Sequence, residues 1–448
     1  MDDHPTPAEL EGFVWNQLTP ERVSAVVSHL VRGCVECRTV VAQFFCALVG
    51  PGEPPEVPLT PEEDAAYDAA LERAVAVALR AERDLFQDRK REALSLIFDA
   101  DPECLPAIPA HLRGVPLIEA LLERSWSLRH ENPERMVRLA QWARLAAEGL
   151  DPQELGNEHI ADHQCRAWIE LGNAHRTADD LDQADQAMGR AVELLLQGTQ
   201  DEVLAARLFD VQASLYGARR RFDLATAALD LVLAIHQRLG DEHLTGRALI
   251  SKGVYAGYQG EAEEAVRLIG EGMRLVDANR DPRLVFVAAH NKARFLMDCG
   301  RFRDARIAVF DLKGRGLDPG GRVNELKVRW LEGQINAGLG ELERAERDLR
   351  EVQQEFEAME LGYKAALVGL ELGAVLLRQG RSSEASEKVL AAADVFSVLG
   401  IGREAGASLL LLRKAFERKM TDAALLDYVI RLLHGLEDGP RKPEPSED

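Results

Sequence analysis

Three side chains near the start of the chain have the types and the spacing of metal ligands. Cys34 and Cys37 form a Cys-x-x-Cys pair, and His29 stands five positions before it. Two thiolates at the beginning of a helix, with an imidazole from the preceding helix, are three of the four ligands of a closed structural zinc site. Cys46, nine residues after Cys37, is one candidate for the fourth ligand. The residue types therefore define a candidate zinc site.

This pattern resembles the zinc-binding anti-sigma-factor domain, whose core is a His, three residues, and then Cys-x-x-Cys followed by a basic residue. Here four residues separate His29 from Cys34, with Gly33 as the apparent insertion. The resemblance implies an upstream ligand near residue 4, where His4 stands. It also implies that the module at residues 1–50 binds a sigma factor.

Two other interpretations of the same residues remain open. Free cysteine is among the most buried residue types, so His29, Cys34 and Cys37 can simply be packing side chains of a small hairpin. Alternatively, the module is a redox sensor in which oxidation of Cys34 and Cys37 releases zinc and changes the affinity for a partner. A thioredoxin-like dithiol is disfavoured, because no alternation of strands and helices surrounds the pair.

Charge and composition exclude several classes of function. The 448 residues include 54 Lys and Arg against 75 Asp and Glu, a net charge of −21 that disfavours nucleic acid or an anionic membrane as partner. Six cysteines are too few for a disulfide scaffold. No signal segment or membrane span is apparent, so we expect a cytoplasmic protein. No phosphate loop, nucleophile elbow or dinucleotide fingerprint occurs, so we expect no enzymatic activity.

A repeat of 40 residues organises most of the chain. Alanine recurs first after 41 and then after every 40 residues, at Ala184, Ala225, Ala265, Ala305, Ala345 and Ala385. Residues with little or no side chain recur about twelve positions earlier, at Gly172, Ala213, Gly253, Ala293, Gly333 and Gly373. Turn glycines, which adopt a left-handed helix cap without strain, stand at Gly260, Gly300, Gly340 and Gly380. Because the apolar spacing between turns is helical, each repeat is predicted to be a helical hairpin that stacks on its neighbours.

The repeat resembles the tetratricopeptide repeat. Trp168, Leu171, Gly172 and Ala184 stand at the family's spacing in the best-matching repeat. The period of 40 residues exceeds the family's about 34 and resembles the arrays of bacterial regulators and adaptors. The resemblance implies an α-solenoid over about residues 158–400, with a groove lined by the first helix of each hairpin.

Under this resemblance the groove is rich in basic and amide side chains. It carries the residues Arg166, Asn173, Arg176, Arg207, Arg247, His290, Asn291, Arg294, Lys327, Trp330 and Gln334. A ladder of arginines beside an exposed Trp330 predicts a site for an acidic peptide or a C-terminal carboxylate. In the alternative, these arginines pair with neighbouring acids such as Glu170 and Asp210 and form a solvated network.

The sequence thus predicts an all-α adaptor or regulator that binds a protein or peptide, with sigma-factor regulation implied by the first resemblance. The redox sensor is the alternative function. The predicted divisions are a Cys/His module (1–50), a Pro-rich linker (51–61), a long amphipathic helix (62–100), a degenerate hairpin or cap (101–157), the repeats (158–400), two capping helices (401–436) and a disordered tail (437–448).

Overall fold

The computed structural model describes residues 4–31, 34–49, 61–98, 108–129, 131–314, 321–399, 403–417 and 423–437. Every regular element within these ranges is a helix, so the predicted all-α class is confirmed. Most of the predicted linker (51–61) and of the predicted tail (437–448) lies outside the described residues. The chain divides into two compact units, Met1–Leu150 and Asp151–Asp448, and each is described by itself.

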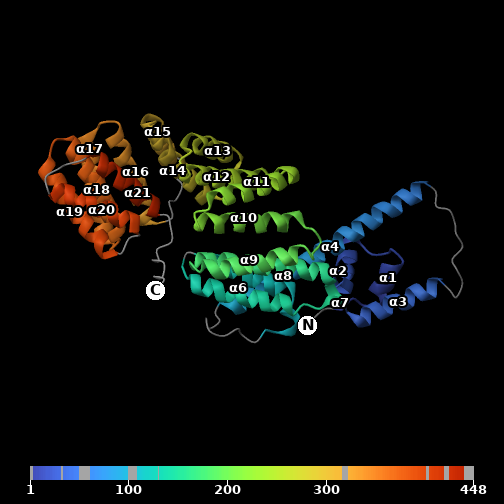
Figure 1. Ribbon diagram of the computed structural model, residues 1–448. Coiled ribbons are helices and arrows are strands. Elements are labelled where there is room, and N and C mark those ends of the chain that lie inside the picture. Colours follow the sequence, from blue (N-terminus) through green and yellow to red (C-terminus); the bar gives the residue numbers. More distant parts are fainter. Residues whose placement is uncertain are drawn as a thin grey trace, which may run out of the picture. The chain divides into compact units, whose positions relative to one another are not determined.

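The first unit begins with a module of three short helices. The helices of the unit are α1 (Pro7–Val14), α2 (Pro20–Val31), α3 (Val35–Val49), α4 (Pro61–Phe98), α5 (Val115–Ser127) and α6 (Pro133–Glu148), with a 3-10 turn at Ala110–Leu112 (Figure 1). The module α1–α3 has a small core, in which Leu10, Val26 and Cys37 are buried. One candidate ligand, Cys37, is therefore also a core residue.

The long helix α4 packs on α2 and α5 within this unit. Ala93 and Ile97, near its C-terminal end, are fully buried. Val75 and Leu79, nearer the middle of the same helix, are 49% and 57% exposed. A helix of 38 residues is much longer than these neighbours of 12 and 13 residues, so they leave part of its length uncovered.

The second unit contains helical hairpins in sequence. Its helices are α7 (Pro152–Leu155), α8 (Asn157–Thr177), α9 (Leu181–Leu195), α10 (Glu202–Ala218), α11 (Phe222–Leu239), α12 (Glu242–Tyr258), α13 (Ala262–Leu275), α14 (Pro282–Asp298), α15 (Phe302–Gly314), α16 (Arg322–Gly338), α17 (Leu342–Ala358), α18 (Gly362–Arg378), α19 (Ser382–Leu399), α20 (Arg403–Glu417) and α21 (Ala423–Glu437). Each even-numbered helix from α8 to α18 packs against the odd-numbered helix that follows it. The even-numbered helix of each pair, from α8 to α18, is called the first helix of its hairpin below. The predicted solenoid of helical hairpins is confirmed.

The periodic small residues lie where the two helices of a hairpin cross. The six alanines of the series from Ala184 to Ala385 are all 0% exposed. A Cβ atom added to Gly253 would stand 2.8 Å from Cγ1 of Ile269 and 3.1 Å from the carbonyl oxygen of Ala265. The turn glycines take φ values between +71° and +91°, as predicted. The 40-residue period is therefore a packing requirement repeated along the chain.

The closest helix contact of this kind gives a testable prediction. A Cβ atom on Gly272 of α13 would stand 2.5 Å from the carbonyl oxygen of Gly246 on α12. Because a backbone carbonyl cannot rotate away, we expect Gly272→Ala to lower the free energy of unfolding by about 1–3 kcal/mol. Gly189→Ala in α9 is the matched control, since nothing lies within 4 Å of its added Cβ. It is expected to raise that free energy by about 0.5–1 kcal/mol. Urea unfolding followed by circular dichroism measures both, and equal effects would contradict the close contact.

Candidate functional site

The Cys/His module brings four candidate metal ligands together. One ligand atom from each of His4, His29, Cys34 and Cys37 lies within 4.8 Å of the other three. Nδ1 of His4 is 3.5 Å from Sγ of Cys34 and 3.6 Å from Sγ of Cys37. Tetrahedral zinc, with Zn–S of about 2.3 Å and Zn–N of about 2.0–2.1 Å, places nitrogen and sulfur ligands about 3.6 Å apart. The spacing of these donor atoms fits zinc.

Each histidine is held by the local structure of its own segment. His4 stands directly before α1, where Thr6 and Glu9 form a reciprocal capping box that fixes the start of the helix. His29 lies in the last turn of α2, and its Nε2 is buried without a hydrogen-bond partner among the described residues. A buried nitrogen in that state is costly, so it points to a ligand that completes the site.

Of the two candidates for the fourth ligand, the structure brings His4 into the group. The side chain of Cys46 lies outside the described residues. His4 is 25 positions from His29 in the sequence. It reaches the site only because α1 packs against α2 and α3.

On the repeats, the predicted arginine ladder exists, and its members are paired with acids. Glu170 on α8 accepts two hydrogen bonds from Arg207 on α10, both of 2.8 Å. Asp210 lies 3.2 Å from Arg207 and 3.1 Å from Arg247 on α12, and Arg166 lies 3.5 Å from Glu170. We call these five residues the arginine ladder. The pairing with Glu170 and Asp210 that the sequence offered as the alternative is confirmed.

The repeat itself sets the register of the ladder. Arg207 and Asp210 are three positions apart on one helix, so they share a face. Arg207 meets Glu170 at a separation of 37 residues, which is the repeat of 40 less about one helical turn. Arg247 meets Asp210 at the same separation of 37 residues. Successive first helices are therefore connected by the same kind of contact.

The pKa values of Glu170 and of the neighbouring Tyr255 depart from their ordinary range. Burial alone would raise the pKa of Glu170, but the charge and the hydrogen bonds of Arg207 outweigh it and hold that pKa below its usual range. Burial raises the pKa of nearby Tyr255 to about 12, opposed by the charge of Arg176 and assisted by the charge of Asp210. The ladder therefore consists of charged groups that are partly removed from water.

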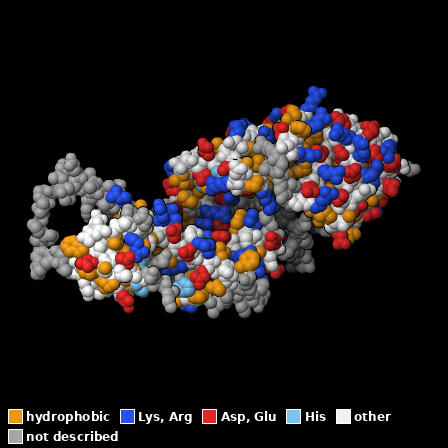
Figure 2. All heavy atoms as spheres, turned by 180° about the vertical axis from the view of Figure 1, so that it is seen from behind, with side chains coloured by type: hydrophobic (Ala, Val, Ile, Leu, Met, Phe, Trp, Pro, Cys, Tyr) orange, Lys and Arg blue, Asp and Glu red, His pale blue; other side chains and the backbone are white. Residues whose placement is uncertain are grey.

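Beside the ladder, Arg176 and Asn173 carry hydrogen-bond donors that meet no carboxylate among the described residues. Arg176 on α8 donates to Oδ1 of Asn173 at 2.8 Å, and it has no carboxylate partner among the described residues. Burial lowers the pKa of Arg176. Nδ2 of Asn173 is buried and has no partner within the described ranges. Arg176 brings the local total to four guanidinium groups against two carboxylates. Figure 2 shows basic and acidic side chains gathered together in a hollow of the surface.

The groove residues predicted in the later repeats have different surroundings. His290, Asn291 and Arg294 are half-buried on α14, and Lys327 is half-buried on α16. Trp330 is only 4% exposed, so the prediction that it is exposed is wrong. Its ring packs 5.9 Å from that of Phe356 and 5.3 Å from that of His434 on α21.

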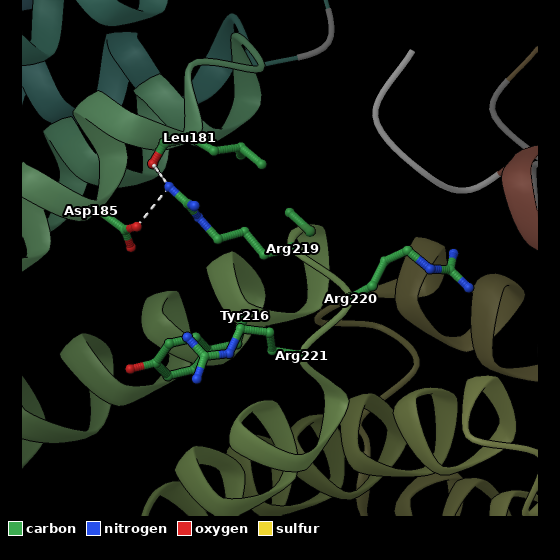
Figure 3. A pocket seen from close by; sticks show the side chains of 7 residues that line it. Leu181, Asp185, Tyr216, Arg219, Arg220 and Arg221 are labelled. Carbon is green, nitrogen blue, oxygen red and sulfur yellow. Dashed lines mark hydrogen bonds and ion pairs between the residues drawn. The ribbon is translucent and has the colours of Figure 1, made fainter. Parts of the chain in front are cut away.

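A pocket that was not predicted from the sequence lies at the turn between α10 and α11. Figure 3 shows that Arg219 points from this turn toward α9. It lies 2.6 Å from Asp185 and donates to the carbonyl of Leu181 at 3.1 Å. Arg221 lies over the ring of Tyr216, at 6.0 Å from its centroid. The three consecutive arginines at 219–221 were the available signal. Because Arg219 is paired with the preceding hairpin, we interpret this pocket as part of the packing contact between adjacent repeats.

Comparisons with known proteins concern the fold. No family model matches the chain, and neither does any curated protein. A Rap protein complexed with competence and sporulation factor is 11% identical with a TM-score of 0.50, over 72% of this chain and 87% of that one. Aspartyl phosphate phosphatase F from Bacillus subtilis is 9% identical with a TM-score of 0.48, over 88% and 94% of the two chains. A tetratricopeptide repeat protein from Parabacteroides merdae is 14% identical with a TM-score of 0.41, over 66% and 98%.

The chain is thus an all-α protein of tetratricopeptide-like helical hairpins, similar in fold to the Rap protein. Among the described residues, no helix combines the length and the apolar character needed to cross a membrane.

Proposed function

We propose that this chain is an adaptor whose first helices recognise an acidic segment of a partner protein beside the arginine ladder. The observation that carries the proposal is the excess of guanidinium groups over carboxylates, together with the unpartnered Nδ2 of Asn173. Arginine donates paired hydrogen bonds to carboxylates, and such charge-assisted bonds are stronger than neutral ones. A partner carboxylate can accept from the half-buried guanidinium of Arg176. The Rap protein of similar fold was solved with a bound factor, so this fold is compatible with a ligand.

Arg176 is the side chain that tests this proposal best. Arg207 is unsuitable for the test, because its removal would leave Glu170 without its two hydrogen bonds. The probe is a fluorescein-labelled peptide of alternating Glu and Gly, titrated with the full chain. We expect Arg176→Gln to weaken binding of this peptide at least about tenfold, which corresponds to about 1.4 kcal/mol.

Arg190→Gln on α9 is the matched control, because Arg190 is exposed and pairs only with Glu193 of the same helix among the described residues. It is expected to leave the affinity unchanged. Raising the salt concentration is expected to weaken binding to the native chain. Equal affinities of the two variants, or equal binding of a Gln–Gly peptide, would refute the proposal.

We propose a second function for the module α1–α3, in which zinc held by His4, His29, Cys34 and Cys37 stabilises a protein-binding surface. The donor spacing and the unpartnered Nε2 of His29 support it. Three short helices with a small core gain much of their stability from such a cross-link. A sigma factor is the partner that the resemblance to anti-sigma domains implies. In the redox-sensor alternative, peroxide oxidises the two thiolates to a disulfide, is itself reduced to water, and releases the zinc.

A further inference from the structure

Helix α21 lies on the first helices of the last two hairpins. It packs against α18, and its buried side chains share a core with Leu326 and Trp330 of α16 and Leu370 of α18. Figure 1 shows α21 next to α16 and α18. Trp330 and Gln334 belong to the surface that the sequence predicted to bind a partner. That surface therefore already holds a helix at this end of the repeats.

The carboxylate in this contact, Glu371, stands at the same position of the repeat as Glu170 of the arginine ladder. Glu371 in the last hairpin and Glu170 in the first both stand two positions before the small residue of the repeat. Glu170 accepts hydrogen bonds from Arg207 of the next hairpin. Glu371 instead contacts the imidazole of His434 on α21, which follows the last hairpin in the chain. Nε2 of His434 lies 2.5 Å from Oε1 of Glu371. His434 of α21 thus contacts Glu371 as Arg207 of the following hairpin contacts Glu170.

One face of α21 makes the contact. Leu426, Val429 and Leu433, at positions i, i+3 and i+7, are 0% exposed. On other faces of the helix Tyr428 is 51% exposed, and Asp427 and Arg431 are also exposed. This spacing of apolar anchors is that of an amphipathic helix bound in a groove.

The polar part of the contact is more specific than packing requires. Glu371 is 8% exposed and accepts hydrogen bonds from Nε1 of Trp330 at 2.5 Å and from Nε2 of Gln334 at 2.6 Å. The hydroxyl of Tyr363 donates to the carbonyl of Leu433 at 2.8 Å. Without His434, the carboxylate of Glu371 keeps two neutral donors and lacks the group that can carry a positive charge. A helix that binds here therefore needs a donor one position after its last apolar anchor.

We propose that α16 and α18 form a helix-binding site that α21 occupies in cis, and that an amphipathic helix of a partner protein displaces α21. The partner helix carries apolar residues at i, i+3 and i+7 and His, Lys or Arg at i+8, which is the pattern of Leu426, Val429, Leu433 and His434. Because α21 belongs to the same chain, its high effective concentration keeps the site closed until such a partner is present. The proposal does not depend on acidic-peptide binding at the ladder.

The test uses the full chain and a fluorescein-labelled peptide with the sequence of residues 423–437. In Val429→Asp, a buried anchor of α21 becomes charged, so α21 leaves the site and the site becomes available. We expect this variant to bind the peptide at least about tenfold more tightly than the native chain. A peptide with His434→Ala is expected to bind the Val429→Asp chain at least about tenfold more weakly than the unaltered peptide.

Tyr428→Asp, on the exposed face of α21, is the matched control and is expected to bind the peptide as weakly as the native chain. Equal peptide binding by Val429→Asp and Tyr428→Asp would overturn the proposal. If Val429→Asp fails to fold, hydrogen exchange of the native chain decides instead. Amides of α21 that exchange much faster than those of α18 support an independently opening helix, and equal protection overturns it. Val429→Asp is expected to leave binding of the Glu–Gly peptide unchanged, which separates the two proposals.

Discussion

Full-length protein purified without chelators is expected to contain about one zinc ion per chain, and Cys37→Ser is expected to contain almost none. The reason is geometric, since His4, His29, Cys34 and Cys37 already present their donor atoms within 4.8 Å of one another. A serine hydroxyl is a poor ligand for zinc beside a thiolate, so three ligands remain for a site that needs four. Elemental analysis by mass spectrometry measures the zinc content directly.

The loss of zinc is also expected to unfold the module α1–α3. Among its described side chains, the fully buried part of its core is Leu10, Val26 and Cys37, so little apolar packing is left to hold the three helices. Hydrogen exchange is expected to show lost protection in α1 and α2, while the repeats stay protected. Cys299→Ser is the matched control, because this half-buried cysteine belongs to the second unit. Native protein without zinc, or a Cys37→Ser variant that retains it, would refute the zinc proposal.

Treatment with peroxide separates structural zinc from the redox sensor. A sensor is expected to release its zinc, with Cys34 and Cys37 recovered as a disulfide in peptide mapping. Full retention of zinc in excess peroxide would exclude the sensor and leave the structural role intact.

Glu170→Gln is expected to lower the free energy of unfolding of the repeats by about 3–5 kcal/mol, because the largely buried Arg207 loses the anion that accepts two of its hydrogen bonds and keeps Asp210. Glu170 is 9% exposed and accepts both hydrogen bonds of Arg207. Glu193→Gln, at an exposed ion pair with Arg190, is the matched control. It is expected to change stability by less than about 1 kcal/mol. Urea unfolding of the full chain measures both variants.

The double variant Glu170→Gln/Arg207→Gln extends this test. It is expected to be more stable than the sum of the single effects predicts, because both members of the pair are then neutral. A loss below about 1 kcal/mol in Glu170→Gln would mean that the ladder is solvated rather than buried.

The same carboxylate gives a pH dependence with a definite sign. The pKa of Glu170 is lower in the folded chain than its ordinary value of 4.5. Its contribution to stability is therefore complete above pH 4.5 and is lost as the pH falls toward the folded-state pKa. The difference in stability between the native chain and Glu170→Gln is expected to be constant at neutral pH and to shrink below pH 4.5. A difference that grows on acidification would contradict the ion pair.

Much of the fold was predictable, because helical hairpins depend on residues close in the sequence. Gly253 and Ala265 are twelve positions apart, and their small size is what the crossing of α12 and α13 requires. The turns were less completely predictable. Asp179 and Arg220 take the same left-handed turn as Gly260, with φ values of 63° and 57°. Residues other than glycine seldom adopt this conformation, so the residue types alone did not predict these two turns.

The site residues divide in the same way. The metal-binding pattern of His29, Cys34 and Cys37 is local, but no pattern in the residues themselves selects His4 over Cys46. Packing of α1 on α3 brings His4 into the group. For the arginine ladder, the sequence supplied both the arginines and the acids. The sequence left open whether the arginines bind a ligand or pair with these acids. The contact between Arg207 and Glu170, which lie 37 positions apart, shows that they are paired.

The sequence by itself determined the helical hairpins, their period and the residue types on the first helices, because spacing along one or two helices fixes these features. Only the tertiary structure decided that Trp330 is buried. The reason is that His434 of α21 is 100 positions from Gln334, and no repeat pattern specifies where a helix beyond the last repeat packs. Its docking depends on which apolar and hydrogen-bonding groups remain uncovered after the hairpins have stacked, and that is a property of the folded chain.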